Sequence, residues 1–175
     1  PSGWANIDVI DGAEIRSPGT CTAYASIDGD VVAITGTPAS VARVQIFERG
    51  ADGTDAWSEV RFHEFDVPRN PDDGLMLGQI SLSVRGTTAV LGFAGDRCDG
   101  LAPCAPGEVR VLNRDVGGVG AWGVSGTLTP DPGYADQGFG ASVDVSSDGR
   151  VVIVGTNPGS SADPSTSGEA YLVER

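Results

Sequence analysis

Residues 139–155 read Phe-Gly-Ala-Ser-Val-Asp-Val-Ser-Ser-Asp-Gly-Arg-Val-Val-Ile-Val-Gly, and this stretch gives the clearest indication of the fold. Its first half alternates apolar and polar residues, which is typical of a strand with one buried face. Asp148-Gly149 is a hairpin-turn signal. The run 151–154 is continuously apolar, as expected of a strand covered on both faces. We therefore predict a β-hairpin, followed after a loop by a third strand near the end of the chain.

Two upstream stretches repeat this pattern. Gly29, Gly86 and Gly149 mark the three hairpin turns and lie 57 and 63 residues apart. A period of about sixty residues is the scale of a propeller blade or a similar repeat unit. Each of the two earlier copies continues into a strand that begins with tryptophan, at residues 57–65 and 122–128. The segment 4–10, which begins at Trp4, matches these two strands.

The predicted fold is all-β and of the β-propeller type, with three four-stranded blades. The strand order starts with a fourth strand at residues 4–10 and stops after a third strand, so one blade is split between the N- and C-termini. Within a single domain covering 1–175, the repeat units span about 13–66, 67–129 and 130–175. The 26 glycines and 11 prolines leave no long helical period uninterrupted.

Composition restricts the partners. The chain has 24 acidic and 11 basic residues, a formal net charge of −13, and every basic residue is arginine. Such a surface repels phosphate backbones and anionic lipid, so we expect no nucleic-acid partner. No apolar run approaches the roughly 18 residues of a membrane span, so no membrane insertion is expected. Because the chain opens at Pro1 without Met, we expect a processed product or an excerpt.

The three cysteines predict one disulfide. Cys98 and Cys104 share a polar loop with five residues between them, and closing it would contribute on the order of 2 kcal/mol. A disulfide here would imply an oxidising compartment, whereas two reduced surface thiols are the alternative. Cys21 aligns with Ala141 at a strand position, which suggests a small, buried and reduced core residue. The spacing does not match a zinc site.

Several motifs resemble a known repeat family. Phe139-Gly140 precedes the clearest hairpin and Gly155-Thr156-Asn157-Pro158 follows it, while Leu77-Gly78 precedes the middle hairpin. A Glu-Arg or Asn-Arg pair closes each third strand, at residues 48–49, 113–114 and 174–175. These features resemble FG-GAP repeats, the units of the integrin α-subunit head and of many bacterial secreted and surface propellers. The resemblance implies a β-propeller, an extracellular or cell-surface location, and work in adhesion or in protein and ligand binding.

Some members of that family hold calcium in the first hairpin of a repeat. Only Asp144 and Asp148 match the ligand pattern here, which is too few oxygen ligands for a Ca²⁺ shell. The chain therefore resembles the calcium-poor branch of the family, and we expect no cofactor. The only calcium binding we predict is weak and loop-based, at Asp96 and Asp99.

Nothing in the sequence singles out a catalytic residue. His63 is the only histidine, and it lies on an alternating strand with no nucleophile nearby in sequence. The paired carboxylates occur in Gly- or Pro-rich turns, where aspartate hydrogen-bonds its own backbone. We predict that the chain is not an enzyme.

The predicted function is that of a non-enzymatic extracellular module for adhesion, protein binding or self-assembly. The loops 37–42, 94–107 and 157–168 differ in length, and they are either a recognition face or tolerated insertions. One alternative is a carbohydrate-binding propeller, which would need exposed aromatic side chains. Another alternative is a non-catalytic propeller fragment of a larger secreted enzyme or surface protein.

The split blade predicts how copies would assemble. The N-terminal strand, with Trp4, Ile7 and Val9, and the C-terminal strand, with Tyr171 and Val173, are complementary parts of one blade. The N-terminal strand of one copy can therefore complete the last blade of a neighbour. Two copies joined in this way would give a six-bladed ring, and an angle that does not close would give a filament.

Overall fold

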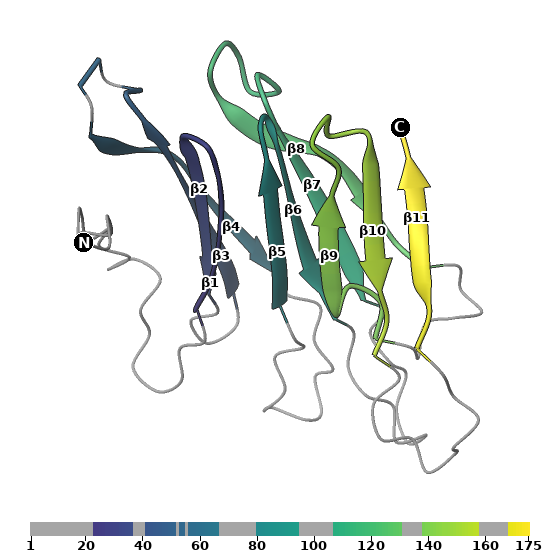
Figure 1. Ribbon diagram of the computed structural model, residues 1–175. Coiled ribbons are helices and arrows are strands. Elements are labelled where there is room, and N and C mark those ends of the chain that lie inside the picture. Colours follow the sequence, from purple (N-terminus) through teal and green to yellow (C-terminus); the bar gives the residue numbers. More distant parts are fainter. Residues whose placement is uncertain are drawn as a thin grey trace, which may run out of the picture.

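The computed structural model describes residues 23–36, 41–51, 53–54, 56–66, 80–94, 107–130, 138–157 and 168–175. Within these ranges the chain is all-β, with eleven strands in three antiparallel sheets (Figure 1). The described residues include no helix of the length and apolarity that crossing a bilayer requires. The all-β prediction is confirmed.

The three sheets, which we call A, B and C, follow one another along the chain. Sheet A contains β1 (Ala23–Asp28), β2 (Val31–Gly36), β3 (Val41–Arg49) and β4 (Trp57–Asp66) in that order. Sheet B contains β5 (Ile80–Arg85), β6 (Thr88–Phe93), β7 (Glu108–Arg114) and β8 (Trp122–Leu128). Sheet C contains β9 (Ser142–Val145), β10 (Val151–Gly155) and β11 (Ala170–Glu174), with β11 at its outer edge among the described strands.

The strands that begin with tryptophan form where the sequence predicts them. β4 and β8 start at Trp57 and Trp122, and each is the outer strand of its sheet. Sheets A and B therefore have the four strands expected of a repeat unit. The predicted strand at residues 4–10, with Trp4, Ile7 and Val9, lies outside the described residues.

The hairpin turns explain the regular spacing of the turn glycines. Gly29, Gly86 and Gly149 have φ values of +57°, +53° and +70°, a left-handed region that glycine enters without the penalty of a side chain. After each turn the register is the same. Val31 pairs with Glu48 in sheet A, Thr88 with Asn113 in sheet B, and Val151 with Glu174 in sheet C. This shared register allows each position to be matched across the three sheets.

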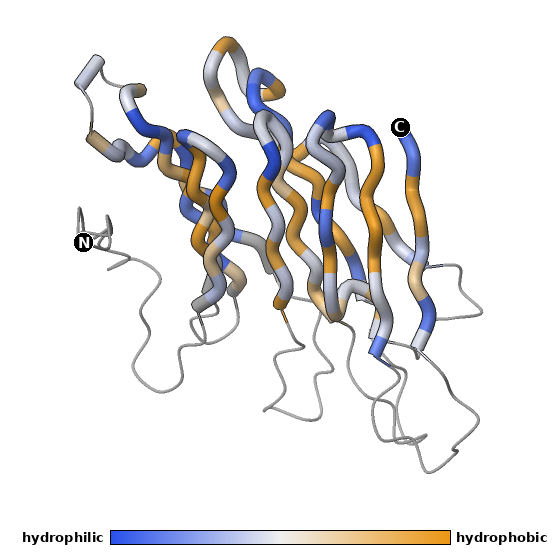
Figure 2. Tube along the Cα trace, in the orientation of Figure 1, coloured by the Kyte–Doolittle hydropathy of each residue, from blue (hydrophilic) through white to orange (hydrophobic). Residues whose placement is uncertain are grey.

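The sheets stack face to face, and their first strands lie side by side (Figure 1). β5 contacts β1 and β2 on one side and β9 on the other. One apolar cluster fills the space between sheets A and B, and a second fills the space between sheets B and C. Figure 2 shows the apolar residues along the strands between the sheets and hydrophilic residues at the hairpin turns. Sheet B is therefore the middle layer, and all six residues of β6 are buried.

The close packing of sheets B and C requires glycine at position 92 of β6. A Cβ at Gly92 would collide with the carbonyl oxygen of Gly140, in the turn before β9, and with the hydroxyl of Ser81 on β5. That hydroxyl donates a hydrogen bond to the same Gly140 carbonyl at 2.9 Å. The missing side chain thus lets sheets B and C approach each other.

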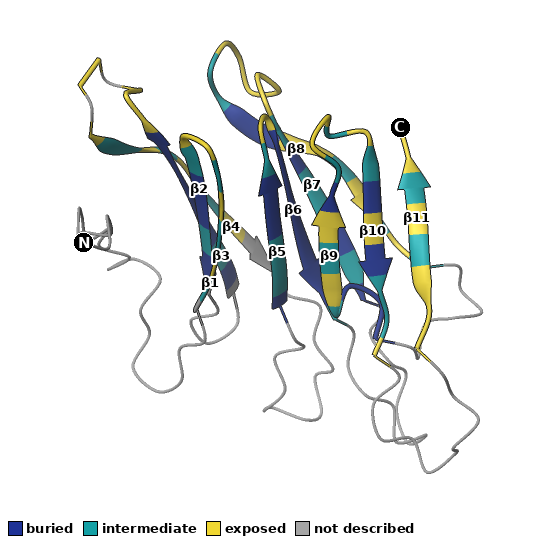
Figure 3. Cartoon of the chain, in the orientation of Figure 1, coloured by how far each residue is buried: buried dark blue, intermediate teal, exposed yellow. Residues whose placement is uncertain are grey.

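The prediction that residues 151–154 are covered on both faces is wrong for Ile153. In β10 the buried residues alternate with more exposed ones, and Ile153 is 42% exposed. Figure 3 shows this contrast between β6, which is buried throughout, and the strands of sheet C. The reason is that no sheet among the described residues covers the outer face of sheet C.

Candidate functional site

The contact between sheets A and B centres on the buried carboxylate of Glu48. This residue, near the end of β3, is only 6% exposed. One carboxylate oxygen accepts a hydrogen bond from the indole Nε1 of Trp122 at 2.8 Å, and the other accepts one from Arg114 at 2.7 Å. A buried carboxylate is stable only when its oxygens have such donors, and the arginine also compensates its charge. Sheet B therefore supplies both donors for one buried acceptor of sheet A.

Trp122 fills the part of this interface that lies beside β3 and β4. Its side chain is fully buried, and its carbonyl oxygen lies 3.3 Å from Nε2 of His63 on β4. Burial, and secondly the positive charge of Arg61, lower the pKa of His63 from its ordinary value of 6.5. The burial of Trp122 makes it unavailable for stacking on a sugar, so this residue does not support the carbohydrate alternative.

Sheets B and C repeat the arginine contact. Arg175 follows β11 at the position that Arg114 has at the end of β7. Its guanidinium donates to the side-chain oxygen of Asn113 at 3.2 Å. Asn113 has the position of Glu48, so the arginine at the end of β7 and the arginine that follows β11 each bind the polar residue at the same position of the preceding sheet.

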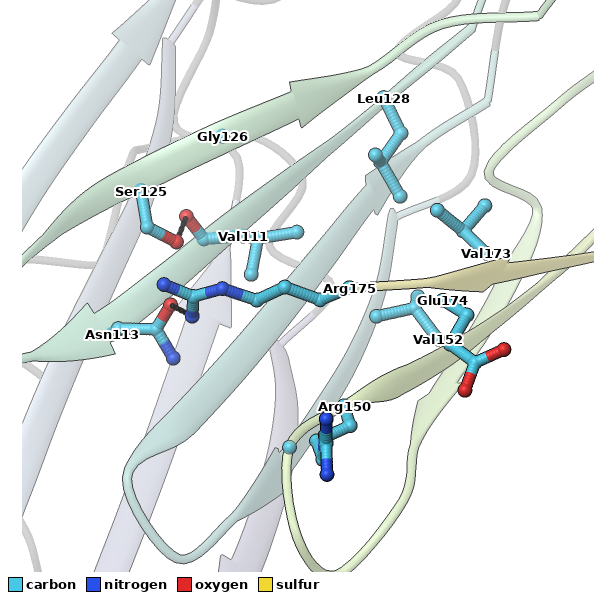
Figure 4. Close-up of a pocket in the computed structure, with 11 residues that line it drawn as sticks. Val111, Asn113, Ser125, Gly126, Leu128, Arg150, Val152, Val173, Glu174 and Arg175 are labelled. Atoms are coloured by element: carbon cyan, nitrogen blue, oxygen red, sulfur yellow. Dashed lines mark hydrogen bonds between the residues drawn. The ribbon is translucent and has the colours of Figure 1, made fainter.

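A cavity lies beside this contact, in the interface between sheets B and C, where β7 and β8 face β10 and β11 (Figure 4). Its volume is about 280 Å³. Val111, Asn113 and Leu128 line it from sheet B, and Val152 and Val173 line it from sheet C. The walls are therefore mainly apolar, with the polar atoms of Asn113 and Arg175 at one side.

The cavity lies between sheets B and C at the position that corresponds to the position of Trp122 between sheets A and B. Trp122 contacts Glu48 and His63. By the register of the strands, Asn113 corresponds to Glu48 and Leu128 to His63. Both Asn113 and Leu128 line the cavity. Trp122 belongs to the fourth strand of sheet B, and sheet C has three strands among the described residues. The cavity is thus where the first residue of a fourth strand of sheet C would lie.

The outer face of sheet C is the second candidate surface. Leu172 is 74% exposed, whereas Ile46, its counterpart in sheet A, is fully buried. Figure 4 shows the carboxylate of Glu174 turned away from the cavity, toward this outer face. Ile153, on the neighbouring strand, is 42% exposed, so aliphatic side chains of two strands are exposed on this face.

The carboxylates of the first hairpin of sheet C make hydrogen bonds within the protein. Asp144 accepts a hydrogen bond from Ser83 at 2.6 Å, which is the main cause that lowers its pKa. Asp148 accepts one from Ser146 at 2.6 Å, again the main cause of a lowered pKa. Among the described residues, no group of three or more histidine, cysteine or acidic side chains could hold a metal ion.

Several predicted residues lie outside the described ranges: Cys21, Cys98, Cys104, Asp96, Asp99, Trp4, Ile7 and Val9. Of the predicted assembly residues, Tyr171 and Val173 are described, and both point toward sheet B. Tyr171 packs edge-on against Phe139, with ring centres 5.5 Å apart, and Val173 lines the cavity.

The sequence reasoning did not identify Glu48 and Asn113 as contact residues. The signal was present, because the repeated Glu-Arg or Asn-Arg pair and the repeated tryptophan mark the residues that meet between sheets. Comparison of the chain with protein-family models, curated proteins and solved structures gave no match.

Proposed function

We propose that this chain is a non-enzymatic, propeller-type module of FG-GAP-like repeats that acts outside the cell by binding proteins, including copies of itself. The propeller arrangement is supported by the common register of the three sheets and by the row of first strands β1, β5 and β9. The extracellular location rests on the family resemblance and on the predicted Cys98–Cys104 disulfide.

The cavity between sheets B and C is the observation that carries the proposed function. It corresponds to the place of Trp122, and residues 4–10 are predicted as a strand that begins with tryptophan. This strand, supplied by a second copy, would pair with the edge of β11 as β8 pairs with β7. Its first residue, Trp4, would then enter the cavity.

The chemistry of the cavity suits an indole. Val111, Leu128 and Val152 offer apolar surface for the ring. The side-chain oxygen of Asn113 accepts a hydrogen bond from Arg175 and keeps a second lone pair for an indole N–H. Between sheets A and B, Glu48 accepts hydrogen bonds from the same two kinds of donor, arginine and tryptophan.

Strand addition can be tested by complementation in trans. A chain lacking residues 1–12 is mixed with a fluorescent peptide of residues 1–12, and binding is followed by anisotropy. We expect saturable binding, and we expect at least tenfold weaker binding for the W4A peptide. The substitution Leu128→Trp should block the cavity and weaken binding of the unmodified peptide to a similar extent.

Sedimentation velocity provides the matching measurement on assembly. The full chain should form oligomers or filaments, and the chain lacking residues 1–12 should not. The proposal fails if the peptide does not bind, if the W4A peptide binds equally well, or if the truncated chain keeps the oligomeric mass of the full chain.

A further inference from the structure

Two arginines line the cavity between sheets B and C. Arg150 precedes β10 and Arg175 follows β11 (Figure 4). The backbone N–H of Arg175 donates a hydrogen bond to the carbonyl oxygen of Arg150 at 2.9 Å, which continues the pairing of β10 with β11 by one residue. Residues two apart on a strand share a face, so both arginines lie on the face of Val152 and Val173, which line the same cavity. The two arginines are therefore directly opposite each other beside the cavity.

Among the three described sheets, only sheet C has two cations at this position. The counterparts are Asp30 and Arg49 in sheet A, and Thr87 and Arg114 in sheet B, each pair joined by the same backbone hydrogen bond at 2.9 Å. Like charges directly opposite each other on neighbouring strands are unfavourable. The additional cation is thus found in the one sheet whose cavity lacks a tryptophan among the described residues.

No carboxylate forms an ion pair with these arginines in the part of the chain that the structure describes. Asp148, in the adjacent turn, accepts hydrogen bonds from within its own turn. Glu174 turns its carboxylate away from the cavity (Figure 4). Arg175 donates to Asn113, but a guanidinium has five N–H groups. Donors of both arginines are therefore left for an anion.

The remaining walls suit an aromatic ring. Val111, Leu128, Val152 and Val173 are apolar, and the cavity corresponds in position to the indole of Trp122. A cavity of roughly 150 Å³ holds one benzene ring. The volume of about 280 Å³ therefore admits a molecule of one or two rings. The cavity combines an apolar region for a ring with a pair of cations for an acidic group.

We propose that this cavity binds a small aromatic carboxylate, with its ring against the apolar walls and its carboxylate on the guanidinium groups of Arg150 and Arg175. Such a ligand takes the place that Trp4 of a second copy takes in strand addition, so its binding releases the copies from each other. The competition rests on the proposed function, whereas binding of the ligand stands without it.

Isothermal titration calorimetry with indole-3-acetate tests the site. The protein is the full chain carrying W4A, so that no Trp4 competes for the cavity. We expect saturable binding of one ligand per chain. The affinity should be at least about tenfold higher than that of indole, which lacks the carboxylate and so forms no charge-assisted hydrogen bond with arginine. Tryptamine, which carries an ammonium group, should bind more weakly than indole.

Variants of one arginine identify the group that binds the carboxylate. Arg150→Gln should weaken indole-3-acetate binding and leave indole binding unchanged, and Arg150→Glu should make tryptamine the tighter ligand. Arg49→Gln is the matched control, because Arg49 is exposed on sheet A, which does not line the cavity. Leu128→Trp fills the cavity and should abolish binding of all three ligands. Circular dichroism and the melting temperature verify that each variant is folded.

Sedimentation velocity of the wild type tests the competition. Saturating indole-3-acetate should dissociate the oligomers or filaments of the wild type. It should leave those of Arg150→Glu intact, because this variant has lost the cation that binds the carboxylate.

The inference is overturned if indole-3-acetate does not bind, if it binds no more tightly than indole, or if it keeps its advantage in Arg150→Gln. The peptide experiment with residues 1–12 separates these results from a failure of the proposed function. A chain that binds the peptide but not indole-3-acetate retains strand addition and loses the ligand site. A chain that binds indole-3-acetate but no peptide keeps the ligand site and loses strand addition. Oligomers that persist in saturating ligand overturn the competition.

Discussion

Trp122 donates its indole N–H to the carboxylate of Glu48 across the boundary between two sheets, over 2.8 Å and entirely within the protein interior. The two residues are 74 positions apart in the chain. Arg114 binds the second oxygen of the same carboxylate. Glu48 therefore connects sheet A to the third and fourth strands of sheet B at once.

Removing the carboxylate of Glu48 should destabilise the protein. In Glu48→Ala the buried Trp122 N–H loses its partner, and we expect the free energy of unfolding to fall by about 2–3 kcal/mol. Glu48→Gln should cost less, because its amide oxygen can still accept the indole hydrogen bond. Urea denaturation followed by tryptophan fluorescence measures both changes. Glu64→Ala is the control, since Glu64 pairs with Arg43 at an exposed site and should contribute less than about 1 kcal/mol.

Gly92 should not tolerate a side chain. The methyl group of Gly92→Ala would collide with the Gly140 carbonyl and separate sheets B and C, so we expect a loss of about 1–3 kcal/mol in thermal or urea unfolding. Gly126→Ala is the matched control, because a Cβ there meets nothing within 4 Å. Equal stability of the two variants would contradict the close approach of the sheets.

Acidification should weaken the fold through His63. Its pKa in the folded chain lies below the ordinary 6.5, so the unfolded chain binds the additional proton first as the pH falls. The free energy of unfolding should decrease as the pH falls through 6.5 toward the lower folded pKa, and it should recover above 6.5. His63→Gln should flatten this slope in denaturation curves between pH 7.5 and pH 5.5, since His63 is the only histidine in the chain and the carboxyl groups of model peptides titrate at about pH 4. An unchanged slope in the variant would assign the pH dependence to other groups.

The loop with Cys98 and Cys104 should contain a disulfide. We expect one alkylated thiol per chain, at Cys21, when intact mass is measured after denaturation and alkylation without reductant. Prior reduction should raise the number to three. Three alkylated thiols in the unreduced sample would contradict the disulfide and remove one support for an extracellular location.

Local patterns were sufficient to predict the strands and hairpins of the described residues. The alternation before each turn and the glycines with positive φ, such as Gly149, are short-range features that act within a few residues. The exposure of Ile153 could not be predicted in the same way. Its apolar surroundings in sequence resemble those of Val90, and the difference arises because β6 has a described sheet on both sides and β10 has one on only one side.

The site required information of a different kind. The repeated Glu-Arg or Asn-Arg pair and the tryptophan were visible as recurring residues, but their partners lie on another sheet. The bond between Trp122 and Glu48 depends on how the sheets stack, which no local pattern encodes. The cavity beside Asn113 was likewise recognisable only by superimposing one interface on the other through their common register.

The difference between Glu48 and Asn113 also bears on how the chain avoids errors while it folds. Similar repeats risk docking in the wrong order, a known failure of repetitive proteins. Arg114 meets a carboxylate, whereas Arg175 meets a neutral amide. If sheet B were skipped and sheet C docked on sheet A, Arg175 could replace Arg114 at Glu48, but the hydrogen bond from Trp122 would be lost, because the described part of sheet C has no fourth strand. The two junctions are therefore chemically distinct, and the indole hydrogen bond favours the assembly order that follows the chain.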